Sequence, residues 1–67
     1  MAAPALTNRQ AEVIRLAGEG LTARATARRL GISVETVNHH RDAAYRRLGV
    51  HNKTAARVAL WRMERGG

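Results

Sequence analysis

The chain has 67 residues, no cysteine, and twelve Lys or Arg side chains against five Asp or Glu, for a formal net charge of +7 at pH 7. A chain of this length forms a single domain without disulfides, and its excess positive charge predicts attraction to a polyanion. Aromatic residues make up only 3% of the chain, too few for the stacking surface of a single-strand-binding protein.

Neither a membrane span nor a signal peptide is predicted. No apolar run approaches the roughly 18 residues of a membrane span, and the first residues lack the basic start of a signal peptide. Residues 1–5 are therefore expected to be a flexible lead-in to one domain at 6–65. The absence of cysteine is compatible with the cytoplasm, where we expect the protein to reside.

The first predicted element is a helix that begins after Thr7. Thr7 and Gln10 fit a capping box, in which each side chain accepts a hydrogen bond from the backbone of the other residue. The helix is expected to end near residues 18–20, where two glycines occur. Apolar residues at helical spacing face inward in this prediction: Val13, Leu16 and Ala17.

Two further helices follow, separated by a short turn that contains glycine. Thr22 is the predicted cap of a helix that continues to Leu30, and Gly31 supplies the left-handed conformation that ends it. Ser33 is the predicted cap of a longer helix at 34–48, which ends at Gly49. Two helices joined in this way form a helix-turn-helix, whose second helix fits the major groove of DNA.

The second helix of this pair has two different faces. One face should pack on the core and carries Val37, His40, Ala44 and Leu48. The opposite face is rich in side chains that can hydrogen-bond to DNA: Glu35, Asn38, His39, Asp42, Tyr45 and Arg46. No strand-like alternation occurs anywhere in the chain, so the expected fold is all-α.

Asn52 is the predicted cap of a fourth helix that continues to about residue 65. This helix is apolar on nearly every side, which is typical of a helix that is buried on every side. In so small a domain one side can face the core, and the other side is expected to face another protein. The alternative is that Leu60 and Trp61 only wrap around the edge of a small core.

The chain resembles the DNA-binding domain of LuxR/FixJ-type bacterial transcription regulators, which have the GerE-like fold. The resemblance covers about nine-tenths of the chain, without gaps, and is carried by LTNRQAEVIRL at 6–16, GLTARATARRLGIS at 20–33, TVNHH at 36–40, RRLGV at 46–50 and NKTAA at 52–56. Region 4 of bacterial sigma factors shares the first three helices. The ending after Leu48, with an Asn-capped fourth helix, distinguishes the LuxR type.

The resemblance implies a four-helix fold and a homodimer formed through the fourth helix, with Val58, Trp61 and Met63 in the interface. Two-fold dimers of this kind read inverted repeats with recognition helices about 34 Å apart. His40 corresponds to the family's characteristic histidine, and its inward position favours a structural role. The family often has Lys where Asn38 stands and no fixed preference at Asp42, so the fold can be carried over but the DNA target cannot.

Candidate base contacts lie on the exposed face of the third helix. Asn38 is suited to bidentate bonding with adenine, and His39 can donate to guanine or contact a thymine methyl group. Asp42 can accept from the N4 amino group of cytosine, or it can pair with Arg46 four residues later and orient that guanidinium. Arg46 is the fourth candidate.

Candidate phosphate contacts flank this face. Helix N-termini and arginine or lysine side chains bind phosphate and set the register of a protein on DNA. The candidates are Thr22 and Arg24 at the start of the second helix, Ser33 and Thr36 at the start of the third, and Arg41, Arg47 and Lys53 on the flank.

The predicted function is therefore sequence-specific binding of double-stranded DNA by a cytoplasmic, nucleoid-associated regulator. No nucleophile motif, phosphate-binding loop or paired acids occur, and the three histidines do not form a zinc pattern, so no enzyme, cofactor or metal is expected. The alternative is a module that binds RNA polymerase or another regulator, with DNA contact secondary. The chain has no room for a sensor domain, so we expect either a stand-alone regulator or a fragment of a longer one.

Overall fold

The computed structural model describes residues 6–66, and these form four helices without a strand, as predicted. The helices are α1 (Asn8–Gly18), α2 (Ala23–Leu30), α3 (Val34–Leu48) and α4 (Lys53–Gly66). The predicted flexible lead-in at residues 1–5 lies outside the described residues. Between residues 6 and 66, no helix has the length and hydrophobicity that a bilayer crossing requires.

Every predicted N-cap is present. The Thr7 hydroxyl accepts a hydrogen bond from the Gln10 N–H at 3.0 Å, and the Gln10 side chain accepts from the Thr7 N–H at 3.1 Å, which completes the capping box. The other caps accept from the backbone N–H three residues later: Thr22 from Ala25 at 3.1 Å, Ser33 from Thr36 at 3.0 Å, and Asn52 from Ala55 at 2.8 Å. Caps of this kind stabilise a helix by about 1 kcal/mol each.

The turn between α2 and α3 depends on Gly31. Its φ of +70° lies in the left-handed region that costs other residues about 1 kcal/mol or more. This conformation lets the Ile32 N–H donate to the Ala27 carbonyl at 3.0 Å, which satisfies the end of α2. Gly49 ends α3 in the same way, with φ of +69°. The turn before α3 therefore depends on Gly31, and the turn after α3 depends on Gly49.

The core consists of two clusters on either side of α1. Val13 packs with Ala27 of α2 and Val37 of α3. The next residue, Ile14, packs on the other side with Ala44 of α3 and with two residues of α4, Ala56 and Leu60. Val13 and Leu16 were predicted to face inward and are buried, but the sequence analysis did not identify Ile14, which is only 2% exposed.

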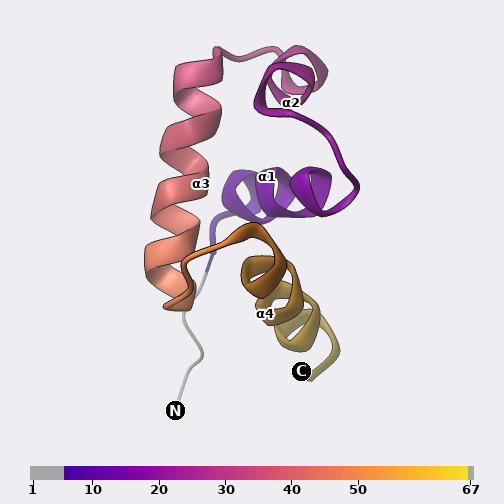
Figure 1. Ribbon diagram of the computed structural model, residues 1–67, viewed down its shortest axis with the longest axis vertical. Coiled ribbons are helices and arrows are strands. Elements are labelled where there is room, and N and C mark those ends of the chain that lie inside the picture. Colours follow the sequence, from indigo (N-terminus) through magenta and orange to yellow (C-terminus); the bar gives the residue numbers. More distant parts are fainter. Residues whose placement is uncertain (1–5, 67) are drawn as a thin grey trace.

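These contacts place α1 against the middle of α3, with α2 toward the N-terminal end of α3 and α4 toward its C-terminal end (Figure 1). The small residues Ala44 and Ala56 are 0% and 1% exposed, so they let α1, α3 and α4 approach closely. All three other helices pack on one side of α3. The opposite side of α3, at the left of Figure 1, is left uncovered.

Candidate nucleic-acid interface

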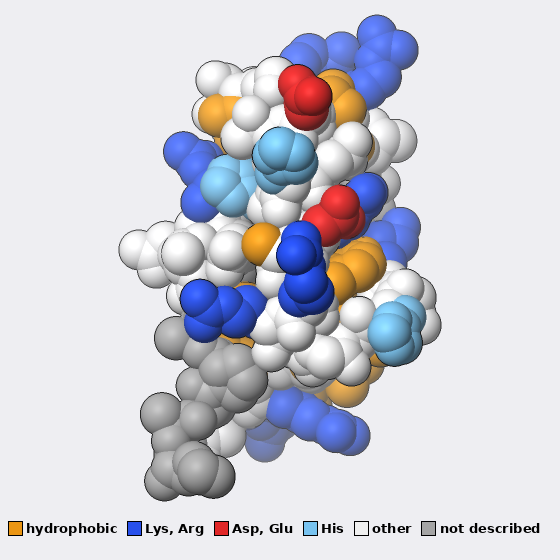
Figure 2. Space-filling view, turned by 90° about the vertical axis from the view of Figure 1, so that its left-hand side faces the viewer, with side chains coloured by type: hydrophobic (Ala, Val, Ile, Leu, Met, Phe, Trp, Pro, Cys, Tyr) orange, Lys and Arg blue, Asp and Glu red, His pale blue; other side chains and the backbone are white. Residues whose placement is uncertain are grey.

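The uncovered side of α3, here called the reading face, carries a row of exposed polar side chains at helical spacing: Glu35, His39, Asp42 and Arg46. Figure 2 looks onto this side, and shows Lys and Arg side chains spread over it, histidines in the upper half and at the lower right edge, and isolated acidic side chains among them. Three of the four predicted base-contacting residues therefore lie in this row. The fourth, Asn38, is half-buried, because it directly follows the buried Val37 and lies at the edge of the row.

The inward face of α3 was predicted to hold four residues, and two of them are fully buried. Val37 is 3% exposed and Ala44 is 0% exposed. Leu48 is half-buried and packs against the cluster around Ile14. His40 is also half-buried.

Tyr45 does not lie where the sequence analysis placed it. It was assigned to the exposed face with Asp42 and Arg46, but it is half-buried and packs against the cluster around Ile14. The physical reason is its position directly after the buried Ala44. A helix turns by about 100° per residue, so Tyr45 lies at the border of the inward face and its ring reaches the core.

The ion pair expected between Asp42 and Arg46 is also not the one that the structure shows. The Asp42 carboxylate lies 3.4 Å from both Nε and an Nη of Arg41, the preceding residue. The Arg41 and Asp42 side chains are 39% and 55% exposed, so water screens this contact and it contributes little to stability. Arg46 is consequently not held by Asp42, and its guanidinium is exposed on the reading face.

Three of the predicted phosphate-binding residues lie around one hollow of about 230 Å³ beside α3. Thr22, Arg41 and Lys53 line it, together with Tyr45. Its remaining lining comes from core residues, among them Val13, Thr26 and Val37. Residues from the starts of α2 and α4 are therefore brought to the same place on the flank of α3.

The other predicted phosphate-binding residues are spread more widely. Ser33 is exposed at the start of α3, and its hydroxyl lies 2.8 Å from that of the half-buried Thr36. Arg24 and Arg47 are exposed on α2 and α3, and Arg24 lines none of the hollows beside α3. These residues surround the reading face rather than forming one cluster.

Three residues of this surface were not among the predicted DNA contacts: Val34, Tyr45 and His51. Tyr45 lines the first hollow, and it also borders a second hollow of about 420 Å³ that Asp42, Arg46 and His51 line. Val34, in the first turn of α3, is 38% exposed. The sequence held a signal only for Tyr45, because its spacing placed it on the face of residues 34–48 that is rich in hydrogen-bonding side chains.

The outer side of α4 forms a second surface, which is apolar with a basic rim. Val58 is 42% and Trp61 55% exposed, whereas Met63, the third residue predicted for a dimer interface, is half-buried. The guanidinium carbon of Arg65 lies 4.7 Å from the centre of the Trp61 ring. The basic side chains around the two exposed apolar residues are Lys53, Arg57, Arg62 and Arg65.

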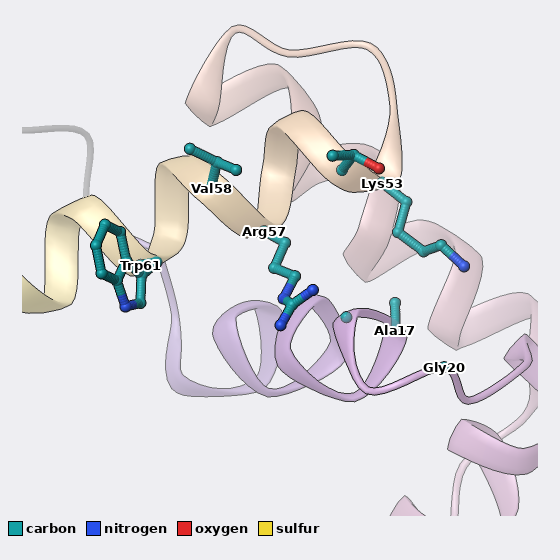
Figure 3. Close-up of a pocket in the computed structure, with 8 residues that line it drawn as sticks. Ala17, Gly20, Lys53, Arg57, Val58 and Trp61 are labelled. Carbon is teal, nitrogen blue, oxygen red and sulfur yellow. The ribbon is translucent and has the colours of Figure 1, made fainter.

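A cleft of about 330 Å³ separates this part of α4 from the end of α1. Figure 3 shows Arg57 extending from α4 toward α1, with Trp61 one turn further along α4. A Cβ at Gly18 would lie 2.8 Å from the Cδ of Arg57, so only glycine lets Arg57 lie this close to α1. An ion pair between Arg15 and Glu64 joins the same two helices.

Comparisons with known proteins agree on one family. The family model described as "GerE: Bacterial regulatory proteins, luxR family" matches residues 4–60. Spore germination protein GerE of Bacillus subtilis (strain 168) is 40% identical over 60 residues, which are 90% of this chain and 81% of that protein. Transcriptional activator protein AnoR of Acinetobacter nosocomialis is 38% identical over 53 residues, 79% of this chain but only 22% of that protein.

A solved structure supports the same relationship. The crystal structure of the response regulator ChrA, from a heme-sensing two-component system, superposes with a TM-score of 0.83 at 36% sequence identity. The match covers 96% of this chain and 32% of ChrA. The chain therefore spans less than a third of AnoR and of ChrA, but about four-fifths of GerE.

Proposed function

The chain belongs to the LuxR family of bacterial regulatory proteins, and on that premise we propose that it binds double-stranded DNA sequence-specifically, with α3 in the major groove. The family consists of transcription regulators, which are not a class of enzymes. The observation that best supports the proposal is the uncovered side of α3, where side chains that can read bases lie beside a basic flank. In protein–DNA complexes, base edges are read by some side chains and phosphates are bound by others. Here α3 would supply the first kind and its basic flank the second.

Each candidate on the reading face has a chemically suited base. Asn38 pairs with adenine, His39 donates to guanine or touches a thymine methyl group, and Arg46 bonds to guanine through two parallel N–H groups. Asp42 accepts from the N4 amino group of cytosine, and its neighbour Arg41 offsets the repulsion between the carboxylate and DNA. Phosphates are contacted by Thr22, Arg24, Ser33, Thr36, Arg41, Arg47 and Lys53.

The proposal is tested by selecting bound duplexes from a random pool with the 67-residue chain. We expect a recurrent motif, arranged as an inverted repeat with half-sites one helical turn, or a multiple of it, apart. The enriched duplex should bind at least about 10³-fold more tightly than its scrambled version at physiological salt. A pool that shows no enrichment after repeated rounds would contradict sequence-specific binding.

We further propose that two copies associate through the outer side of α4, around Val58 and Trp61, with Met63 beside them. Exposed aromatic residues are enriched in protein interfaces, and both apolar residues lie on one side of α4. The dimer is weak in free solution, because Arg57, Arg62 and Arg65 around the contact repel their equivalents in the second copy. Binding of both copies to adjacent half-sites then strengthens it.

Trp61→Glu is expected to abolish this association and the cooperative binding to an inverted repeat. A carboxylate in the contact is desolvated without a specific partner, and Trp61 is exposed enough for the fold to tolerate the change. Sedimentation and DNA titrations measure the two effects, with Asn8→Glu as a control that adds the same charge on α1. If Trp61→Glu sediments and binds cooperatively like the unmodified chain, α4 is not the interface.

The exposed Val58 and Trp61 also favour a second candidate function, in which this surface contacts RNA polymerase or another regulator and DNA binding is secondary. A gel shift on random genomic fragments separates the two. Binding without polymerase supports the first function, and binding only with polymerase supports the second. Under either function we expect the protein to act in the cytoplasm, at the nucleoid. We also expect residues 6–65 to form the one domain that carries the function.

A further inference from the structure

We infer that Thr22, Arg41, Tyr45 and Lys53 hold one particular DNA phosphate in the hollow on the flank of α3, with the Tyr45 hydroxyl as a donor. The inference rests on the proposed DNA binding and goes beyond it in two respects. It assigns a role to Tyr45, and it makes four separate side chains parts of a single site. The fixed position of this site would set the register of α3 in the major groove.

The four side chains reach the hollow from three helices. Thr22 is the cap of α2, Arg41 and Tyr45 lie one turn apart on α3, and Lys53 is the first residue of α4. The inner wall is formed by core residues, including Val13, Thr26 and Val37, which are all buried. An apolar wall lowers the local dielectric constant, so that a phosphate placed there interacts more strongly with the cations than it would in open solvent.

Each of the four residues has a donor available for a phosphate oxygen. Among the described residues, neither the Tyr45 hydroxyl nor the Lys53 ammonium has a hydrogen-bond or ion-pair partner. The Thr22 oxygen accepts from the Ala25 N–H, which leaves its own O–H free to donate. Arg41 uses Nε and one Nη for Asp42. A guanidinium has five N–H donors, so others remain for phosphate.

The charges favour this hollow over its neighbour. The first hollow is lined by two cationic side chains, Arg41 and Lys53, and by no acidic one. The second hollow, on the other side of Tyr45, is lined by the Asp42 carboxylate as well as by Arg46 and His51. Because a carboxylate repels phosphate, the anion belongs in the first hollow, and Asp42 is left to face the bases.

Tyr45 is suited to holding the site in place. Its ring packs against the cluster around Ile14, so the hydroxyl is carried by the core and not by a flexible side chain. A donor held rigidly loses little conformational entropy when the phosphate binds, in contrast to the long Lys53 side chain. Tyr45 therefore contributes position, and Arg41 and Lys53 contribute most of the attraction.

The test combines protein variants with a duplex in which one phosphate at a time is replaced by an uncharged methylphosphonate. The duplex is the one enriched by selection. Tyr45→Phe removes only the hydroxyl and keeps the ring in the core, so we expect an unchanged melting temperature and about tenfold weaker binding. The slope of log K against log salt should stay the same for Tyr45→Phe, and should become shallower by about 0.9 for Lys53→Ala.

The deciding measurement is the coupling between protein and DNA substitutions. At one phosphate position, the methylphosphonate should weaken the DNA affinity of the unmodified chain by a larger factor than it weakens the affinity of Tyr45→Phe or of Lys53→Ala. The two factors should differ by at least about threefold for each variant. Both variants must identify the same position. Arg24→Ala, which removes a proposed phosphate contact outside the hollow, should not couple to that position.

The outcomes separate this inference from the proposed function. If the chain selects a duplex but Tyr45→Phe binds it normally, or if Tyr45→Phe and Lys53→Ala couple to different phosphates, the single site is overturned and sequence-specific binding stands. If the unmodified chain selects no duplex at all, both the proposed function and this inference fail.

Discussion

Ile14→Ala is expected to lower the free energy of unfolding by about 2–5 kcal/mol, the largest effect on stability in this chain. Ile14 is 2% exposed and packs in a cluster with Ala44, Ala56 and Leu60, where only Leu60 has a side chain of equal size. The two alanines cannot extend into the space that the change creates, so a cavity remains between α1, α3 and α4. Thermal and urea unfolding followed by circular dichroism measure the loss.

A domain of this size has a total stability of roughly 0.1 kcal/mol per residue, so the change is expected to remove about a third or more of that stability and to lower the melting temperature clearly. Val58→Ala is the matched control, because it also shortens an aliphatic side chain but at a position that is 42% exposed. It should change stability by no more than about 0.5 kcal/mol. An Ile14→Ala variant as stable as Val58→Ala would contradict the position of α1 between two clusters.

The second large effect is expected from the arginines at the end of α3. Arg46→Ala and Arg47→Ala should each weaken DNA binding, and Arg47→Ala should also flatten the salt dependence, by about 0.9 in the slope of log K against log salt for the lost phosphate contact. Arg46 lies in the row of base-reading residues and is not held by Asp42. Its loss should therefore cost about 1–3 kcal/mol more on the selected duplex than on a scrambled one.

Arg47 should behave differently, since a phosphate contact weakens binding to all sequences about equally. Affinities for the selected and the scrambled duplex, titrated between about 50 and 200 mM salt, distinguish the two roles. Arg28→Ala serves as the control that removes the same charge from an exposed position of α2 without a proposed DNA contact. An unchanged slope in Arg47→Ala, or an equal loss on both duplexes in Arg46→Ala, would contradict the assigned contacts.

The helix boundaries could be predicted because they depend on short-range chemistry. Thr7, Thr22, Ser33 and Asn52 each satisfy a backbone N–H three residues ahead. Such caps act within one helical turn, and the left-handed glycine at Gly31 acts within the loop, so both can be recognised without knowledge of the tertiary structure. The all-α fold followed from these local signals and their spacing, whereas the family was recognised by the resemblance of motifs along the chain.

The tertiary environment of individual side chains was harder to predict. Val13 and Ile14 are adjacent in sequence, and both are buried because helices pack on two sides of α1. A single-face pattern identifies only one of them. Tyr45 was misassigned for a related reason, since whether a residue at the border of a face is covered depends on the helices that pack beside it.

The ion pair of Asp42 shows a further limit. Spacing of four residues favoured Arg46, but Arg41 is the nearer guanidinium in the structure. Arg41 and Arg46 both lie within about one helical turn of Asp42 in the sequence, and the choice between them changes the free energy little because exposed pairs contribute less than about 1 kcal/mol. A sequence pattern cannot rank such partners, so the roles of single arginines depend on the structure and on measurement.

The central claim, that α3 reads DNA sequence, is tested most directly by the ratio of affinities for the selected and the scrambled duplex, measured with the unmodified chain and with Asn38→Ala. We predict a ratio of at least about 10³ for the unmodified chain, and a ratio about 10-fold smaller for Asn38→Ala, with binding to the scrambled duplex unchanged. Equal affinity of the unmodified chain for both duplexes would contradict the account.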